Sequence, residues 1–167
     1  DKSTATIAQR TTAVREYFKF MARNELIPNN PAMYLEAPAV KHKEKTPLDG
    51  AQIRAMIHAA TNLRNKAIIM TLAQTGMRVS EIFGLTLEQY QRRIDNTVII
   101  CGKGSKERKV TFADETVKMI DAYVANERKG DSEWLFVSTH GTKMRRDDSS
   151  KMLKLCARKA GVENWQD

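Results

Sequence analysis

Cysteine and histidine are scarce in this sequence, and none of them is placed for a disulfide framework or a metal site. Cys101 and Cys156 are far apart and lie outside any CxxC motif. The three histidines, His42, His58 and His140, have no partner at the spacing of metal ligands. These absences disfavour zinc binding and disulfide scaffolding, and they fit a reducing compartment such as the cytoplasm.

Long apolar runs are lacking as well. No run approaches the roughly 20 residues that are needed to cross a bilayer. The N-terminal stretch DKSTATIAQR lacks the apolar core of a signal peptide. We therefore expect a soluble, intracellular protein with no membrane partner.

Negative charge is the third deficit. The chain has 20 acidic residues against 28 lysines and arginines, which leaves a formal net charge of +8. Apolar residues make up 41% of its 167 residues, enough for a packed core. The excess of positive charge favours a polyanionic partner, and nucleic acid is the commonest one.

The N-terminal part predicts two helices that cannot enclose a core by themselves. Residues 6–24 carry apolar side chains at helical spacing with basic and polar residues opposite. Asn30 and Pro31 resemble an N-cap and a first helical turn, which predicts a short helix through about Leu35. This unit is therefore expected to be incomplete or to lean on another surface.

Residues 39–47 are polar and basic and end at Pro47, which is typical of an exposed linker. They separate a first domain, residues 1–38, from a second one, residues 48–167. In the second domain the patterns predict helices at about 49–60, 63–74, from 80 and over 114–128 and 148–160, a hairpin with strands 98–101 and 109–112, and an extended segment at 134–138. The expected fold class is mainly α with a small β-hairpin (α+β).

The stretch TGMRVSEIFGL, residues 75–85, places Arg78 two residues after a glycine and three before Glu81. Gly76 is expected to end one helix as a left-handed cap, so that Arg78 projects at the start of the next. One explanation is an ordinary surface ion pair between Arg78 and Glu81. The other is a phosphate clamp, because a guanidinium can hold two phosphate oxygens at once.

The hairpin tip GKGSKER is not a nucleotide-binding P-loop. Thr97 stands where the first glycine of that motif belongs, Gly104 replaces its Ser/Thr, and a strand follows where a helix is required. What remains is a basic turn that carries Lys103, Lys106, Arg108 and Lys109. It is either a solvated turn that discourages edge aggregation or a finger that brings a lysine to a phosphodiester.

Together the two motifs resemble the tyrosine recombinase family, also called phage integrases. The matching residues are Thr75, Gly76, Arg78, Ser80, Glu81, Leu85, Gly102, Lys103, Gly104, Lys106 and Arg108. Downstream, LFVSTHGTKM resembles the family's Phe-Ser-x-x-G segment, and residues 11–38 resemble the end of its core-binding domain. The resemblance implies a partial helical core-binding domain over 1–38 and the first part of a catalytic domain over 48–167.

The resemblance implies site-specific DNA recombination or integration through a 3′-phosphotyrosine intermediate, without metal or other cofactor. Arg78 is then the first catalytic arginine, Glu81 its supporting acid, and Lys103 the general acid that protonates the departing 5′-oxygen. Lys106 and Arg108 are implied to contact DNA phosphates or to position the hairpin. The implied partner is double-stranded DNA, on which family members act as tetramers at paired sites. The implied compartment is the cytoplasm of a prokaryotic cell or of a phage-infected host.

Four further arginines, Arg10, Arg15, Arg145 and Arg146, are candidate DNA-binding residues. Surface solvation explains each of them equally well.

The family's His-x-x-Arg box and nucleophilic tyrosine are not found in these 167 residues. None of the three histidines has an arginine three residues on. Tyr17, Tyr34 and Tyr90 are early or on packing segments, and Tyr123 has the spacing of a core residue. We therefore expect a truncated chain that is inactive alone and is monomeric or only weakly associated. A naturally short, non-catalytic DNA-binding protein is the alternative.

Overall fold

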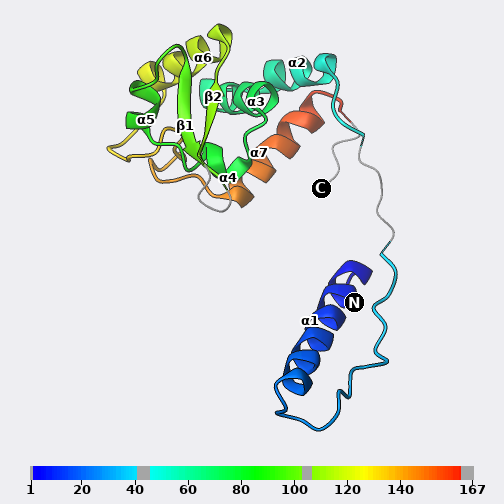
Figure 1. Ribbon diagram of the computed structural model, residues 1–167. Coiled ribbons are helices and arrows are strands. Elements are labelled where there is room, and N and C mark those ends of the chain that lie inside the picture. Colours follow the sequence, from blue (N-terminus) through cyan, green and yellow to red (C-terminus); the bar gives the residue numbers. More distant parts are fainter. Residues whose placement is uncertain (1, 41–45, 103–106, 163–167) are drawn as a thin grey trace. The chain divides into compact units, whose positions relative to one another are not determined.

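The structure is a computed structural model that describes residues 2–40, 46–102 and 107–162. The chain divides into two compact units, residues 1–45 and 46–167 (Figure 1). The elements follow in the order α1 (Thr4–Arg23), α2 (Gly50–Ala59), α3 (Leu63–Thr75), α4 (Val79–Ile82), α5 (Leu87–Gln91), β1 (Thr97–Cys101), β2 (Glu107–Thr111), α6 (Asp114–Asn126) and α7 (Arg146–Lys159). The predicted fold class, mainly helical with one small antiparallel sheet, is confirmed.

The first unit consists of α1 and the segment that follows it. Ser3 caps the helix, since its hydroxyl accepts the backbone N–H of Thr6. No residue of α1 is buried, and its apolar side chains Val14, Tyr17 and Phe20 are exposed. The structure thus confirms the predicted helix. Assignment of this unit to a core-binding domain stays a prediction.

The short helix expected after Asn30 is wrong, because residues 31–34 form a turn. The Asn30 side chain does accept the backbone N–H of Ala32 at 2.9 Å, as an N-cap would. Met33 and Tyr34, however, are exposed. Only Ala32 of residues 31–34 is buried. A helix this short therefore buries too little to offset the unfavourable free energy of helix nucleation, and the chain forms a turn instead.

The second unit begins with two helices whose ends were predicted from their caps. Asp49 and Gln52 form the expected capping box at the start of α2. Asn62 caps the start of α3, and Gly76 ends it in the left-handed conformation, with φ of 61°. A residue with a Cβ would be strained at that φ, so a glycine allows the chain to turn directly from α3 toward α4.

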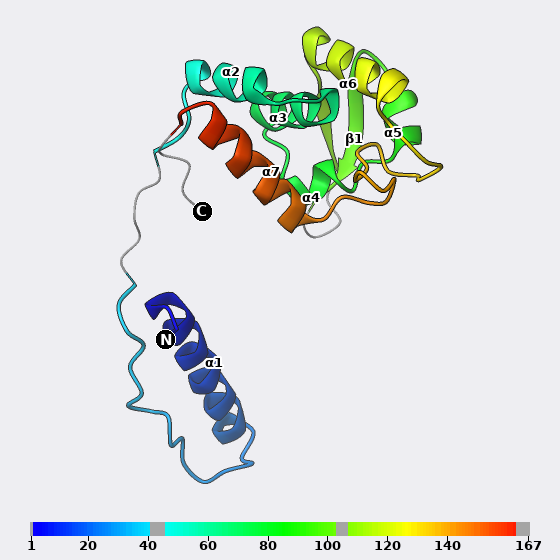
Figure 2. The ribbon, with the colours of Figure 1, turned by 180° about the vertical axis from the view of Figure 1, so that it is seen from behind.

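Helix α3 lies at the centre of the second unit and packs against α2, α6 and α4 (Figures 1 and 2). Its residues Ala67, Ile68 and Thr71 are fully buried. The core is completed by side chains from the other elements, among them Met56, Ile82, Leu85, Ile100, Val110, Ile120, Leu135, Phe136 and Leu153. Tyr123 is buried with them, as its helical spacing predicted.

Strands β1 and β2 form a two-stranded antiparallel sheet in which Val98 pairs with Val110 and Ile100 with Arg108. Val98, Ile100 and Val110 are buried, whereas Ile99 and Lys109 on the alternate positions are exposed. One face of the sheet therefore packs on the core and the other faces solvent. The segment 134–138 is extended, with isolated bridges from Trp134 and Val137.

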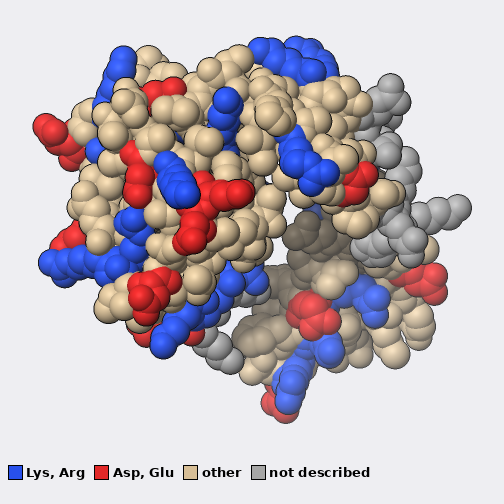
Figure 3. Space-filling model, turned by 90° about the horizontal axis from the view of Figure 1, so that it is seen from above, with Lys and Arg blue, Asp and Glu red and all other residues tan. Residues whose placement is uncertain are grey.

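Helix α4, the start of α7 and the ends of both strands at Cys101 and Glu107 lie at the same end of the second unit (Figures 1 and 2). On the opposite face, which Figure 3 shows, basic and acidic side chains are interspersed without one continuous basic patch. None of the described helices is long and apolar enough to span a membrane.

Candidate active site

Arg78 stands at the junction that the α3 cap creates. It occupies the N-cap position of α4 with an extended backbone, φ −66° and ψ 149°. The preceding residue, Met77, is buried and anchors this junction to the core. The Arg78 side chain remains 65% exposed. The guanidinium of Arg78 therefore lies at the surface, while the backbone next to it is anchored to the core through Met77.

Glu81 is bound to Arg78 twice. Its carboxylate accepts the backbone N–H of Arg78 at 2.7 Å and the guanidinium Nη1 of the same residue at 3.0 Å. Only 7% of the Glu81 side chain is exposed. The predicted pair is therefore present, but its acid is buried, unlike the acid of an ordinary surface ion pair.

A third residue completes this cluster. Arg108 of β2 donates from Nη2 to Glu81 Oε2 at 2.8 Å, across 27 positions of sequence. Arg108 alternates with Lys109 along the strand, so it projects on the same face of the sheet as the buried Val110. That face is turned toward α4. We call Arg78, Glu81 and Arg108 the arginine–glutamate cluster.

The pKa of Glu81 reflects this environment. Burial acts to raise the pKa of the carboxyl group, but hydrogen bonds from the Arg78 backbone, Arg108 and the Arg78 side chain outweigh burial. The pKa of Glu81 is consequently lower than its ordinary value of 4.5. Glu81 is therefore an anion at neutral pH, and it holds two guanidinium groups in place.

The ionised Glu81 is expected to stabilise the folded chain. Because its pKa is lower in the folded state, the contribution is complete above pH 4.5 and is lost as the pH falls through the folded pKa. Glu81→Gln should lower the free energy of unfolding by about 1.5–3 kcal/mol at pH 7. The variant should also flatten the acid side of the stability curve. Urea unfolding between pH 7 and 3 measures both effects.

Glu88→Gln is the matched control, because Glu88 also pairs with an arginine but is 69% exposed. It should cost less than about 1 kcal/mol and leave the acid dependence unchanged. Equal acid dependence in the wild-type chain and in Glu81→Gln would contradict the stabilising role of the Glu81 carboxylate.

A cavity of about 410 Å³ opens beside the arginine–glutamate cluster. Its lining residues are Arg78, Ser80, Glu81, Gly84, Leu85, Gln89, Ile100, Cys101 and Gly102. The cavity therefore lies between α4, α5 and the end of β1 that leads into the hairpin tip. A phosphate group that enters this space reaches the Arg78 guanidinium, which makes no other hydrogen bond among the described residues.

Lys103 and Lys106 lie outside the described residues, so their roles stay predictions. Arg145 is the N-cap of α7 and Arg146 its first residue; both are exposed, and α7 contacts α4.

Arg10 and Arg15 are exposed on α1 in the first unit. The structure thus brings Arg78, Glu81 and Arg108 together. Arg145 and Arg146 begin α7, which contacts α4. Whether Arg10 and Arg15 bind DNA stays a prediction.

The tyrosines of the second unit are structural. Tyr90 is buried, and its hydroxyl donates to Asp121 at 2.8 Å. Tyr123 is buried, and its hydroxyl accepts the backbone N–H of Val137 at 3.2 Å. Burial is the main cause that raises the pKa of both phenols. Neither hydroxyl is exposed for attack on a phosphodiester.

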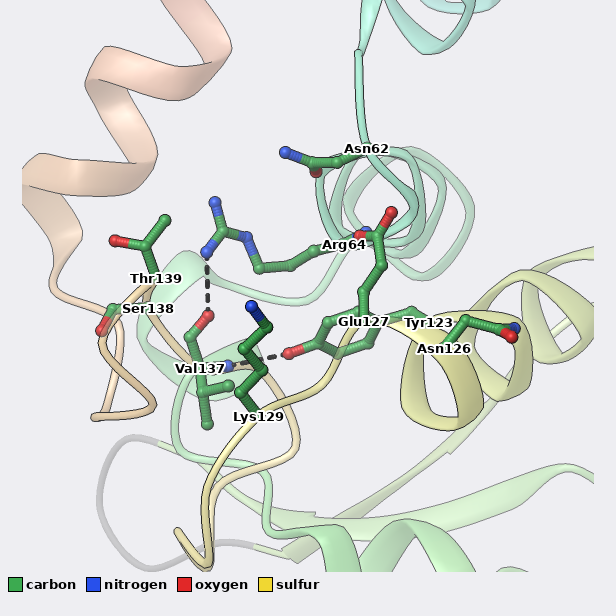
Figure 4. A pocket seen from close by; sticks show the side chains of 9 residues that line it. All are labelled: Asn62, Arg64, Tyr123, Asn126, Glu127, Lys129, Val137, Ser138 and Thr139. Carbon is green, nitrogen blue, oxygen red and sulfur yellow. Dashed lines mark hydrogen bonds between the residues drawn. The ribbon is translucent and has the colours of Figure 1, made fainter.

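A second cavity of about 410 Å³ lies at the other end of α3 (Figure 4). Glu127 accepts the backbone N–H groups of Leu63 and Arg64 there, and Arg64 donates to the carbonyl of Val137 at 3.1 Å. These bonds tie the start of α3 to the end of α6 and to the extended segment. We interpret this cavity as a structural junction.

The sequence missed two features of the candidate site. It did not predict that Arg108 binds Glu81, although the period-two alternation of β2 indicates which face Arg108 occupies. It gave no signal for Gln89 and Cys101 in the cavity wall. Over the part of the chain that the structure describes, no group of His, Cys, Asp and Glu side chains could hold a metal ion.

The sequence is similar to one known family and to several of its curated members. The sequence model of the phage integrase family matches residues 47–167. The chain is 30% identical to the tyrosine recombinase XerD of Halalkalibacterium halodurans over 172 residues, which covers 97% of this chain and 57% of that protein. It is 31% identical to XerD of Yersinia pestis, over 94% of this chain and 56% of that protein. The chain thus spans somewhat more than half the length of these curated relatives.

Solved structures share the fold. The Tn1549 transposon integrase, solved in complex with circular intermediate DNA, matches 98% of this chain and 60% of its own chain with a TM-score of 0.75 at 21% identity. The XerA recombinase matches 98% of this chain and 65% of its own with a TM-score of 0.64 at 22% identity. At these identities the likeness concerns the fold.

Proposed function

The chain belongs to the phage integrase family, and from this membership we propose that it is part of a tyrosine recombinase. The complete enzyme would cut and rejoin double-stranded DNA at specific sites through a 3′-phosphotyrosine intermediate. The arginine–glutamate cluster beside its cavity is the observation that carries this proposal. A solvated surface pair needs neither a buried acid nor a second arginine.

The proposed chemistry requires fixed positive charge. Attack of a tyrosine hydroxyl on the phosphodiester gathers negative charge on the non-bridging oxygens. Arg78 would bind these oxygens, because its side chain is 65% exposed and, among the described residues, its guanidinium is hydrogen-bonded only through Nη1 to Glu81. Lys103 would protonate the departing 5′-oxygen. The covalent intermediate keeps the bond energy for religation, so no metal or other cofactor enters the proposed mechanism.

We place the nucleophilic tyrosine outside these 167 residues. Tyr90 and Tyr123 are buried and hydrogen-bonded. Tyr17 and Tyr34 belong to the first unit. On this proposal the 167 residues bind DNA but do not cleave it, and tetramers at paired DNA sites form only in the whole protein. The compartment we propose is the cytoplasm of a prokaryotic cell or of an infected host.

The gene around this segment tests the proposal. Its reading frame beyond Asp167 is expected to encode a His-x-x-Arg box and a tyrosine within about 120 residues, the size of an ordinary domain. A long open frame without these residues would remove the recombinase proposal. A stop codon directly after Asp167 would favour a non-catalytic DNA-binding protein.

Arg145 and Arg146 are expected to contact DNA phosphates at the start of α7. Positive charge there is partly offset by Asp147 and Asp148 in the first turn. Replacement of either arginine by alanine should weaken binding to any duplex and reduce the slope of log affinity against log salt by about 1. Fluorescence anisotropy with a labelled duplex at several salt concentrations measures this slope.

Arg92→Ala is the control for this experiment. Arg92 is exposed but paired with Glu88 at 2.8 Å on α5, so its loss should change the slope little. If the slope is unchanged in Arg145→Ala and Arg146→Ala, the two residues do not contact phosphates.

A further inference from the structure

Arg108 reaches the candidate site from the strand that follows the hairpin tip. We propose that Arg108 is a positioning residue, which holds the Glu81 carboxylate so that this carboxylate directs the guanidinium of Arg78. The inference rests on the proposed function of Arg78 and adds a second arginine to it. Arg108 acts through Glu81 rather than on the DNA.

The two carboxylate oxygens of Glu81 accept hydrogen bonds from different donors. Oε2 accepts both the backbone N–H of Arg78 and Nη2 of Arg108, while Oε1 accepts Nη1 of Arg78. The Arg78 backbone and Arg108 together occupy Oε2, which leaves Oε1 for the Arg78 side chain. With both oxygens engaged, the carboxylate has one orientation, and the guanidinium that it holds has one direction.

The two arginines differ in what else supports them. Arg78 lies at a helix cap and is 65% exposed, so its side chain is the less enclosed of the two arginines. Arg108 lies on a strand that is paired to β1 and packed on the core through Val110, and its side chain is 42% exposed. Arg108, on the paired strand, thus holds Glu81, and Glu81 holds the more exposed Arg78.

Charge supports the same arrangement. A carboxylate as buried as that of Glu81 is costly unless it is paired, and a single exposed guanidinium compensates it only in part. Two guanidinium groups around one carboxylate leave a net charge of +1 on the cluster. The cluster that carries this charge borders the cavity through Arg78 and Glu81, where a phosphate would enter.

The test uses the complete recombinase and a DNA substrate that traps the covalent intermediate. Arg108→Ala is expected to slow single-turnover cleavage at saturating DNA by about 10- to 100-fold, since small misplacements of a reacting group cost factors of this size. The dissociation constant for DNA should change less than about threefold. Arg108→Lys keeps the charge and is expected to recover part of the rate.

A double-mutant cycle tests whether Arg108 affects cleavage through Glu81. In a Glu81→Gln background, Arg108→Ala should slow cleavage by less than about threefold further, because the carboxylate through which it acts is already gone. Lys109→Ala is the matched control. Lys109 is the neighbouring cation on the opposite face of β2, so the rate at saturating DNA should stay near that of the wild type.

Two outcomes would overturn the inference. The first is that Arg108→Ala and Arg108→Lys, both with wild-type melting temperatures, cleave at the wild-type saturated rate but bind DNA more weakly and with a smaller salt slope, as expected of a direct phosphate contact. The second is a full effect of Arg108→Ala in the Glu81→Gln background. Failure of the proposed function would look different: the wild-type enzyme would form no covalent intermediate. Failure of the role proposed for Arg78 would appear as normal cleavage by Arg78→Ala.

Discussion

Arg78→Ala in the complete recombinase is expected to abolish DNA cleavage while the affinity for DNA stays within about threefold of the wild type. Loss of one fixed donor to a developing oxyanion typically costs a factor of about 10²–10³ in rate, and loss of a charged arginine at a phosphoryl group costs about 10³–10⁵. Arg78 makes one hydrogen bond to Glu81 and keeps the rest of its fork for a ligand. The covalent protein–DNA complex, resolved on a denaturing gel, measures cleavage directly.

The control for this variant is Arg92→Ala, an exposed arginine that also pairs with a glutamate on its own short helix. It should form the covalent complex at the wild-type rate. Cleavage by Arg78→Ala at a rate near that of the wild type would show that Arg78 does not stabilise the transition state. It would also remove the catalytic role proposed for the arginine–glutamate cluster.

Lys103→Ala is expected to slow cleavage of ordinary DNA strongly, and a 5′-thio leaving group should restore the rate. A general acid contributes about 10²–10⁴-fold when an alkoxide departs, whereas a thiolate leaves without protonation. Lys103 lies in the hairpin tip outside the described residues, so the expectation comes from its motif. Cleavage of matched oxygen and sulfur substrates by the wild-type enzyme and the variant gives the ratio.

Lys109→Ala separates this effect from a general loss of positive charge. Lys109 is an exposed cation on the same hairpin, opposite Ile99 on the solvent face of the sheet. Its removal should change the cleavage rates of the two substrates equally. If sulfur fails to rescue Lys103→Ala, Lys103 is not the general acid, and its place at the phosphate would then be electrostatic.

The sequence by itself determined the local features of this protein. The capping box of Asp49 and Gln52 and the glycine cap at Gly76 were predictable, since each depends on residues three or four positions apart. The same holds for the pair of Arg78 and Glu81. The motifs around Arg78 and the hairpin also indicated the family, which the match over residues 47–167 bears out.

Local sequence signals did not predict the structure correctly where the outcome depends on burial in the folded chain. Asn30 offered a correct cap, but Ala32 is the only buried residue of the turn at 31–34, and no helix forms. Glu81 could equally have been a solvated surface acid, and only the packing around α4 makes it a buried one.

Only the tertiary structure placed Arg108 against Glu81, 27 residues away along the chain. This contact depends on how the fold places β2 near α4, and that arrangement follows from many weak apolar contacts across the whole core. The sequence therefore determined which charged groups are present and which helix end presents Arg78. The packing of distant segments decided which of them share one carboxylate.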